Sequence, residues 1–448
     1  MGKYFGTDGI RGIANRDITP LTALKLGQAA GCILTREKYD RPVVLIGRDT
    51  RISGDMIESA LTAGLTSTGC DVLLGGVIPT PGVPFLARSL KLDYSMVITA
   101  SHNPMEDNGI KCFTSQGYKL LSHQEEEMET LMDQGLPDDF DAPVAEKIGK
   151  IMPLPDPLER YRLFVQNLAP ERLDGLSVAL DCANGSTHRV ALEILSNLGA
   201  RVVAINTHPT GTNINYRCGA TNPELLQTLM KGGGFDAGFA FDGDGDRVIA
   251  IDEMGQILDG DHILNMFALF GQQRGLLNTK TVVATVMSNL GLEKSLSRAG
   301  IRLLRSDVGD KNVVKMMVEE NAVLGGEKSG HIIFLEDSTT GDGIITALHI
   351  LTLLKQSRRC LSSFRGEMTL YPQVLRNVKV KDKQAVMDSE KFNDYIRDIT
   401  REMGESFRIL VRPSGTESLI RVMAEGPDSK DTNDVVEKIC RFIESLNS

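Results

Sequence analysis

The sequence has no excess of positive charge and therefore lacks the signature of a general nucleic-acid binder. Its 448 residues include 49 lysines and arginines against 59 aspartates and glutamates, a formal net charge of −10 at pH 7. A nucleic-acid phosphate backbone calls for a basic surface, so we expect no nucleic-acid partner. Any phosphate that the chain binds must be met by a few placed groups.

Cysteine pairs and long apolar runs are also missing. Seven cysteines are scattered from Cys32 to Cys440 without a C-x-x-C, which argues against a zinc knuckle or a redox pair and suits a reducing compartment. The longest mostly apolar stretch, 343–354, is interrupted by His349 and is too short to span a bilayer. The first residues have no apolar signal-peptide core. We therefore expect a cytoplasmic location and no membrane partner.

Glycine motifs for nucleotides are absent as well. The chain contains no G-x-x-x-x-G-K-[ST], and no G-x-G-x-x-G follows a predicted strand. Neither a P-loop nor a dinucleotide-binding turn is therefore indicated.

What the chain does contain is a repeated pattern of a helix-like segment, a glycine and an apolar strand. The glycines are Gly69, Gly199 and Gly300, and glycine in this place supplies a left-handed helix cap. An apolar strand also precedes each helix, at 42–46, 177–180 and 281–286. The pattern predicts three α/β domains of similar topology, although an unrelated α/β chain can show it by chance.

Beyond about Tyr371 the pattern changes. Alternating strands at 375–380, 407–411 and 419–424 combine with two charged helices, which is typical of a small α+β domain. We predict an α/β protein with three similar α/β domains and a smaller C-terminal α+β domain. The predicted boundaries are 1–150, 151–254, 255–370 and 371–448.

The first segment with chemical potential is Thr99-Ala100-Ser101-His102-Asn103-Pro104, continued by Asn108-Gly109-Ile110-Lys111. It follows the apolar run 95–98, which places Ser101 at a strand end, where α/β sheets collect ligands. Serine alone is a weak nucleophile, and the residues around it do not form a G-x-S-x-G elbow. A polar turn without function is the alternative.

The second segment is Asp242-Gly243-Asp244-Gly245-Asp246-Arg247, between two strand-like runs. Three carboxylates at alternate positions would repel one another unless a cation lay between them, and hard oxygen ligands suit Mg²⁺ or Ca²⁺. Glu253 stands where a calcium loop has its twelfth residue, but Arg247 stands where that loop needs glycine. We favour a Mg²⁺ site over a calcium loop or an acidic turn.

Two further loops complete the set. In Gly325-Gly326-Glu327-Lys328-Ser329-Gly330-His331, alternate side chains would share one face of an extended segment and suit sugar hydroxyls; a polar hairpin tip is the alternative. Arg412-Pro413-Ser414-Gly415-Thr416-Glu417, followed by Arg421, offers arginine forks, hydroxyls and free N–H groups for a phosphate, or is a tight turn. Together the four segments indicate phosphoryl transfer on a sugar phosphate.

The four motifs, in this order, resemble the α-D-phosphohexomutase superfamily over essentially the whole chain. The opening KYFGTDGIRG and the segment Val308-Gly309-Asp310-Lys311 are similar to the members that act on glucosamine phosphates. The resemblance implies a four-domain fold around a central active-site cleft. It also implies an isomerase that interconverts glucosamine 6-phosphate and glucosamine 1-phosphate and feeds UDP-N-acetylglucosamine synthesis.

The resemblance also assigns residues. It makes Ser101 the phosphorylated catalytic serine, which holds one Mg²⁺ per chain with the loop carboxylates Asp242, Asp244 and Asp246. The other catalytic candidates are His102, Lys111, Arg11 and Arg247. The sugar-reading candidates are Glu327, Ser329, His331 and Asp310. The phosphate-binding candidates are Arg412, Ser414, Gly415, Thr416 and Arg421. Glucosamine 1,6-bisphosphate is the implied intermediate and activator.

Two positions depart from the glucosamine group: Lys328 replaces a usual glutamine, and Ser418 replaces a usual proline. Lys328 keeps glucose or mannose phosphate open as the alternative substrate. A non-enzymatic sugar-phosphate or calcium-binding protein is a remote alternative. The partner expected in all but the last case is a small hexose or hexosamine phosphate. The oligomeric state stays open, with a homodimer as one arrangement.

Overall fold

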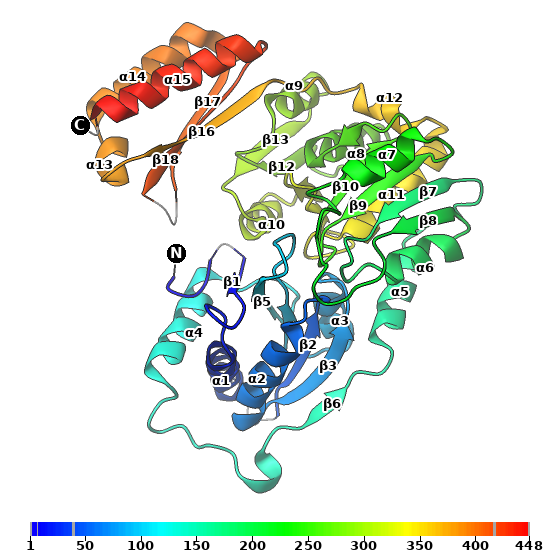
Figure 1. Cartoon of the computed structure of the whole chain (residues 1–448), viewed down its shortest axis with the longest axis vertical. Coiled ribbons are helices and arrows are strands. Elements are labelled where there is room, and N and C mark those ends of the chain that lie inside the picture. Colours follow the sequence, from blue (N-terminus) through cyan, green and yellow to red (C-terminus); the bar gives the residue numbers. More distant parts are fainter. Residues whose placement is uncertain (1, 7, 38–40, 415–417, 447–448) are drawn as a thin grey trace. The chain divides into compact units, whose positions relative to one another are not determined.

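The computed structural model describes residues 2–6, 8–37, 41–414 and 418–446 (Figure 1). The chain divides into two compact units. The larger joins Gly2–Met287 to Ile301–Gly366, and the smaller joins Ser288–Gly300 to Glu367–Ser448. Within the described ranges, no helix is both long and apolar enough to cross a bilayer.

The larger unit begins with a six-stranded sheet in the order β1-β5-β4-β2-β3-β6. Its strands are β1 (Ile10–Ile13), β2 (Val43–Arg48), β3 (Asp71–Val77), β4 (Tyr94–Ile98), β5 (Asp107–Thr114) and β6 (Ile151–Pro153). Its helices are α1 (Pro20–Glu37), α2 (Gly54–Ser67), α3 (Gly82–Ser89) and α4 (Ser122–Gln134). Strands β4, β2, β3 and β6 run parallel, while β5 turns back antiparallel beside β4. The core includes the fully buried side chains of Leu26, Ile46 and Leu61.

A second sheet has five strands in the order β11-β10-β9-β7-β8. Its strands are β7 (Ser177–Asp181), β8 (Arg201–Ile205), β9 (Ala237–Phe241), β10 (Val248–Asp252) and β11 (Ile257–Leu258), and its helices are α5 (Pro157–Asn167), α6 (Val190–Asn197) and α7 (Glu224–Lys231). Strand β9 is parallel to β7 and antiparallel to β10. The aspartate-rich loop is therefore the tip of a β-hairpin.

A third sheet has four strands in the order β13-β12-β14-β15. Its strands are β12 (Thr281–Thr285), β13 (Arg302–Ser306), β14 (Leu324–Gly326) and β15 (Ile332–Phe334), and its helices are α8 (Gly260–Gln273), α10 (Asp310–Glu319), α11 (Gly343–Ser357) and α12 (Leu361–Arg365). Strands β14 and β15 pair antiparallel, so the segment Glu327–His331 joins the strands of a second hairpin.

The smaller unit holds a three-stranded antiparallel sheet in the order β16-β18-β17. Its elements are α9 (Leu290–Arg298), β16 (Gln373–Lys379), α13 (Lys383–Met387), α14 (Glu390–Met403), β17 (Arg408–Pro413), β18 (Leu419–Glu425) and α15 (Ser429–Leu446). Helices α14 and α15 show strong apolar faces, and their buried side chains include Phe392, Ile399, Val436 and Ile439.

The predicted fold class is confirmed, and the local reason is visible at the three glycines. Gly69, Gly199 and Gly300 have φ of +93°, +99° and +70°, the left-handed values that a helix cap requires. Asn108–Lys111, which continues the Ser101 segment, lies in β5, a strand that the sequence analysis did not predict. The first sheet also gains β6 just beyond residue 150, and the exact domain boundaries stay a prediction.

Candidate active site

Ser101 occupies a strained position three residues after the last residue of β4. Its φ is +52°, a left-handed value that costs a non-glycine residue about 1–3 kcal/mol. The side chain is fully buried, and its Oγ donates a hydrogen bond of 2.6 Å to Asp242 Oδ2. A strained backbone persists only where its surroundings hold it, and such residues cluster at functional sites. The strain at Ser101, together with its hydroxyl directed at a carboxylate of another sheet, makes Oγ a candidate reacting atom.

His102 is hydrogen-bonded to Arg247, which bears on whether it can act as a base for Ser101. Its Nδ1 accepts a hydrogen bond of 2.8 Å from Arg247 and lies 3.3 Å from the Ser101 hydroxyl. Burial, then the positive charges of Arg247 and Arg11, lower the pKa of His102 to about 4. The ring is therefore neutral near pH 7 and its Nδ1 lone pair is engaged. This arrangement does not favour His102 as the base that activates Ser101.

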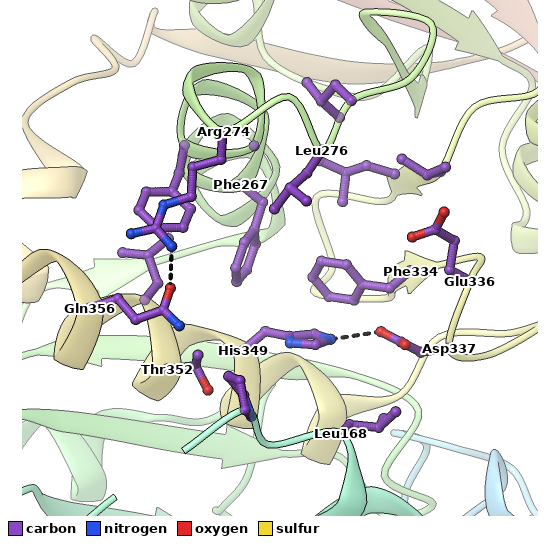
Figure 2. Close-up of a pocket in the computed structure, with 17 residues that line it drawn as sticks. Leu168, Phe267, Arg274, Leu276, Phe334, Glu336, Asp337, His349, Thr352 and Gln356 are labelled. Carbon is purple, nitrogen blue, oxygen red and sulfur yellow. Dashed lines mark hydrogen bonds and ion pairs between the residues drawn. The ribbon is translucent and has the colours of Figure 1, made fainter. Parts of the chain in front are cut away.

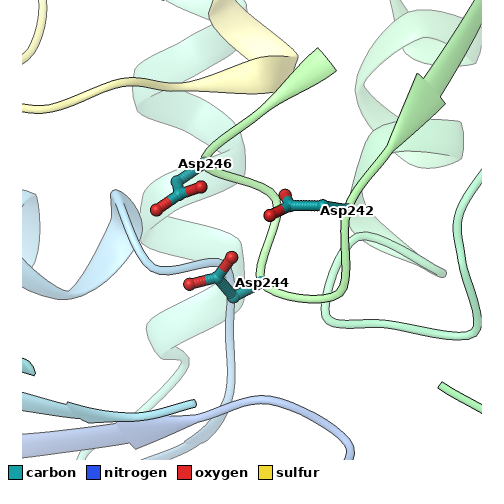
Figure 3. A group of neighbouring side chains, drawn as sticks. All are labelled: Asp242, Asp244 and Asp246. Atoms are coloured by element: carbon teal, nitrogen blue, oxygen red, sulfur yellow. The ribbon is translucent and has the colours of Figure 1, made fainter. Parts of the chain in front are cut away.

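The three aspartates of the β9–β10 loop converge as the sequence predicts (Figure 3). All three are buried, and one carboxylate oxygen of each lies within 4.8 Å of the others. Asp244 Oδ2 accepts from the Thr80 hydroxyl at 2.6 Å, whereas the buried Asp244 Oδ1 has no hydrogen-bond partner among the described residues. A buried, unsatisfied carboxylate oxygen within a carboxylate triad fits a hard divalent cation.

Electrostatics distinguish the members of this triad. Burial and repulsion from Asp244 and Asp246 raise the pKa of Asp242 well above its usual range. Burial would also raise the pKa of Asp246, but Lys111 and then His331 outweigh it and hold that pKa well below its usual range. The buried site thus stores like-charge repulsion that a cation would relieve.

Lys111 faces this cluster from β5. Its Nζ lies 2.9 Å from Asp244 Oδ2, 2.8 Å from Asp246 Oδ2 and 3.3 Å from Asp8 Oδ2. Burial lowers the pKa of Lys111, but the surrounding carboxylates more than offset it and raise the pKa well above its usual range. Lys111 is therefore an ammonium group, which can stabilise negative charge or give up a proton but does not accept one.

Asp8 ties Arg11 to the cluster and was missed by the sequence analysis. It pairs with Arg11 at 2.9 Å and with Lys111, and it also contacts Lys119, which in turn bonds to Asp310. Burial raises the pKa of Asp8, but Lys111, Lys119 and Arg11 outweigh it and leave the pKa lowered. The D-G-I-R-G spacing places Asp8 beside Arg11 and was the available signal.

The sugar-reading candidates are only partly brought together. The residues from Glu327 to Gly330 form a turn closed by a Gly330 N–H bond to Glu327 O. Their backbone is thus the hairpin tip that was the alternative, and the extended segment is wrong. His331 is buried, with Nδ1 3.6 Å from Asp246 Oδ1 and Nε2 3.4 Å from Asp310 Oδ2. Burial lowers the pKa of His331, but Asp246 and Asp310 outweigh it and raise the pKa. Ser329 is exposed at the tip of the turn.

In the smaller unit, two of the phosphate-binding candidates face each other across strands. Arg412 on β17 and Arg421 on β18 are register partners, so their side chains leave the same face of the sheet. Ser414 is buried, and its carbonyl accepts from Lys383, a residue that the sequence analysis missed. Like charges at paired positions are unfavourable and suit a bound anion. Gly415 and Thr416 lie outside the described residues.

Glu253 does not join the carboxylate triad. Its side chain accepts from Ser362 N at 3.2 Å and also contacts the Ser362 hydroxyl, at the start of α12. The loop's flanks are the strands β9 and β10. Glu253, the residue that suggested a calcium loop, is therefore engaged by α12 and not by the triad.

A separate cavity of about 370 Å³ lies among α8, α11 and β15 (Figure 2). Its walls are mainly aromatic and aliphatic, and Phe267 packs edge-on against Phe334 with ring centres 4.9 Å apart. The polar groups that line it are largely paired with one another: His349 with Asp337 at 2.8 Å, and Arg274 with Gln356 at 2.6 Å.

Comparison with known proteins identifies the family of the whole chain. Four family models match in chain order: phosphoglucomutase/phosphomannomutase alpha/beta/alpha domain I at residues 2–137, domain II at 159–255, domain III at 259–371 and the C-terminal domain at 375–442. The chain is 48% identical over 448 residues to phosphoglucosamine mutase of Carboxydothermus hydrogenoformans, with all of both chains covered.

Solved structures share the fold. A phosphoglucomutase/phosphomannomutase family protein of Burkholderia thailandensis superposes with a TM-score of 0.83 at 23% identity, covering 99% of this chain and 98% of its own. The N-acetylphosphoglucosamine mutase of Aspergillus fumigatus, solved in complex with GlcNAc-6P and magnesium, gives a TM-score of 0.71 at 16% identity, covering 100% and 96%.

Proposed function

The chain belongs to the phosphoglucosamine mutases of the phosphoglucomutase/phosphomannomutase superfamily, and from that membership we propose how its residues interconvert glucosamine 6-phosphate and glucosamine 1-phosphate. Such enzymes are isomerases whose partner is a small sugar phosphate. The observation that carries the residue assignment is the buried Ser101 Oγ, held 2.6 Å from Asp242 beside two further carboxylates.

In the proposed cycle, Ser101 carries a phosphoryl group and gives it to the free hydroxyl of the hexosamine phosphate. Its P–Oγ bond breaks as a new P–O bond to the sugar forms, which yields glucosamine 1,6-bisphosphate. The bisphosphate turns around, and Ser101 takes back the other phosphoryl group. The proton lost by the sugar hydroxyl in the first transfer is replaced on the freed hydroxyl after the second, so atoms and charge balance over the cycle.

One Mg²⁺ would be held by Asp242, Asp244 and Asp246 together with the serine phosphate, where it would neutralise negative charge during transfer. The residues fit, because their buried oxygens converge and Asp244 Oδ1 has no other partner among the described residues. Lys111, Arg247 and Arg11 supply further positive charge around Ser101. Since Lys111 is an ammonium group held by carboxylates, we assign it charge stabilisation.

We further propose that Glu327, Ser329 and His331 read the sugar and that Asp310 receives the ammonium group of glucosamine. Asp310 is a buried carboxylate beside His331, which supports this role. The phosphate that does not react would be bound by Arg412, Ser414, Gly415, Thr416 and Arg421. A cytoplasmic location belongs to the same proposal, because all seven cysteines are free.

The deciding experiment measures turnover of glucosamine 1-phosphate by the purified protein with Mg²⁺ and a trace of the 1,6-bisphosphate. Glucose 1-phosphate and mannose 1-phosphate are assayed in parallel, and Ser101→Ala is the control. We expect glucosamine 1-phosphate to have the highest kcat/KM. A preference for glucose or mannose would move the chain to the neighbouring substrate group and implicate Lys328. Equal activity of Ser101→Ala would reject the phosphoserine mechanism.

A further inference from the structure

Arg51 is the feature that the assigned chemistry leaves unexplained. It lies between β2 and α2, and its side chain is 0% exposed. A buried arginine is costly unless each of its N–H groups is paired, so its partners indicate why it is retained.

The hydrogen bonds of the Arg51 guanidinium go to Asp49 and to carbonyl oxygens of the segment 101–107. Nε donates to Asp49 Oδ2 at 3.0 Å, and Nη1 donates to Asp107 O at 3.0 Å and to Pro104 O. Nη2 donates to Ser101 O at 3.0 Å and to Asn103 O at 2.8 Å. These five bonds equal the five N–H donors of a guanidinium, a number that lysine cannot supply.

The same segment is held from two other directions. Asp49 Oδ2 also accepts from the Thr99 hydroxyl at 2.7 Å, and Thr99 Oγ1 accepts from Ser101 N at 2.9 Å. From the second sheet's domain, Asn215 Nδ2 donates to Ser101 O at 2.8 Å and to Asn103 O at 3.0 Å. The backbone of Ser101 is therefore fixed on both its N–H and its C=O sides.

The metal-binding loop packs on this arrangement. A Cβ at Gly243 would lie 2.7 Å from Ser101 O and 2.9 Å from Asn215 Nδ2, so only glycine fits there. The carbonyl that Arg51 and Asn215 hold is thus also the contact between the serine loop and the loop of Asp242. Displacing this carbonyl would move Ser101 Oγ relative to the carboxylates.

From this geometry we infer that Arg51 is a positioning residue for the phosphoryl transfer proposed above. It holds the 101–107 backbone, and through that backbone it fixes the direction of the Ser101 hydroxyl and its left-handed φ. The inference rests on the proposed function, because it concerns the serine that carries the phosphoryl group. It requires no contact between Arg51 and the substrate.

The test compares Arg51→Lys with the matched control Arg48→Lys. Arg48 lies three residues away and pairs instead with Asp55 at 2.6 Å and Glu58 at 3.7 Å on α2. A misplacement of reacting groups by about 1 Å can cost about 10²-fold in rate. We expect Arg51→Lys to lower kcat about 10²-fold with KM within about threefold, because the sugar- and phosphate-binding residues are untouched. Arg48→Lys should keep both constants.

Asn215→Gly is a second variant. Asn215 has a left-handed φ of +57°, which glycine adopts without strain, so the substitution removes only the side-chain donor. It should lower kcat about tenfold with the same unchanged KM, and it decides the matter if Arg51→Lys does not fold. The concentration of active sites in each preparation is measured as the phosphate on Ser101 after incubation with the 1,6-bisphosphate. A loss of folded protein is then not mistaken for a lower kcat.

Folded Arg51→Lys with wild-type kcat would overturn the inference, as would parallel losses in the Arg48→Lys control. Wild-type protein that turns over none of the three sugar phosphates would instead reject the proposed function, so the two failures are distinguishable.

Discussion

The carboxylate loop of Figure 3 and the cavity of Figure 2 lie in the same compact unit but are built in opposite ways. The cavity is roomy, its walls are apolar, and two pairs, His349 with Asp337 and Arg274 with Gln356, satisfy much of its polar lining. The loop is buried, yet it leaves Asp244 Oδ1 without a hydrogen-bond partner among the described residues and keeps three carboxyl groups within 4.8 Å of one another.

The difference teaches that concavity alone is a poor guide to chemistry in this protein. Paired polar groups have little left to offer a reaction, whereas unsatisfied and mutually repelling groups gain from a cation or a transferred phosphoryl group. We therefore expect substitutions in the loop to change activity more than stability, and substitutions in the cavity to do the reverse.

The largest effect is expected for Ser101→Ala. Removing the proposed nucleophile should lower kcat by about 10⁴-fold or more, while the free energy of unfolding falls by about 1–3 kcal/mol, because Asp242 loses the hydrogen bond from Ser101. Steady-state kinetics and urea denaturation measure the two quantities. Phe267→Leu in the cavity is the matched control and should keep kcat within about twofold. Comparable losses of activity in both variants would remove the contrast between the regions.

Asp242→Asn should separate activity from stability. With Mg²⁺ present, we expect kcat to fall about 10²–10³-fold, the range for losing one preorganised electrostatic group. In EDTA the variant should melt higher than the wild type. The pKa of Asp242 is raised in the folded state, so the wild type loses stability as pH rises through that pKa, and asparagine has no charge to lose. Thermal melts in EDTA across pH 5–9 check this, and a lower melting temperature would contradict the like-charge account.

Phe334→Ala should show the opposite behaviour. Phe334 lines the cavity and packs against Phe267 and His349, with ring centres 4.9 Å and 4.5 Å away. Its loss should cost about 1–3 kcal/mol of unfolding free energy, since the ring is half-buried, while kcat stays within about twofold. Denaturation and kinetics on one preparation give both numbers. A loss of activity with unchanged stability would mean that the cavity takes part in the reaction.

The smallest effect is expected at a satisfied buried carboxylate outside the active site. Tyr161 donates to Asp342 Oδ2 at 2.6 Å, and burial raises the pKa of Asp342 to about 6 despite this bond. Tyr161→Phe should cost about 1–2 kcal/mol at pH 7. Because the folded pKa is raised, the contribution of Asp342 is fully present below about pH 4 and is lost as pH rises through about 6. The Tyr161 bond favours the charged form of Asp342, so the cost of Tyr161→Phe should shrink as the pH falls through about 6, and denaturation at pH 4 and pH 7 measures the change.

Local sequence signals were enough to predict the fold class. Gly69, Gly199 and Gly300 marked three helix ends, because few other residues adopt left-handed φ without cost. The strand pairing of Lys111 in β5 was not predicted, since strand pairing leaves no unique mark on so short a polar segment. At Glu327 the sequence left an extended segment and a hairpin tip open, and the structure has the turn of a hairpin tip. Membership of α9 in the smaller unit was equally invisible, because it depends on contacts between residues far apart in sequence.

The site was predictable where chemistry clusters in one loop and unpredictable where it is assembled across the chain. The alternate spacing in the sequence was enough to predict the cluster of Asp242, Asp244 and Asp246. The role of Arg51 could not be predicted in this way. Its partners include backbone carbonyl oxygens about 50 residues away, and every residue type has such a carbonyl. Thr80, which bonds to the Asp244 carboxylate from the first sheet's domain, was also missed, because the two residues are far apart in the sequence.

The most direct test of the central claim is the transfer of labelled phosphate from glucosamine 1,6-bisphosphate to the protein in Mg²⁺, followed by mapping of the labelled residue. We predict one labelled phosphate per chain, located on Ser101, whose label is replaced by unlabelled phosphate when excess unlabelled glucosamine 1-phosphate is added; Ser101→Ala should take up no label. A protein that turns over the substrate without ever carrying label on Ser101 would contradict the account.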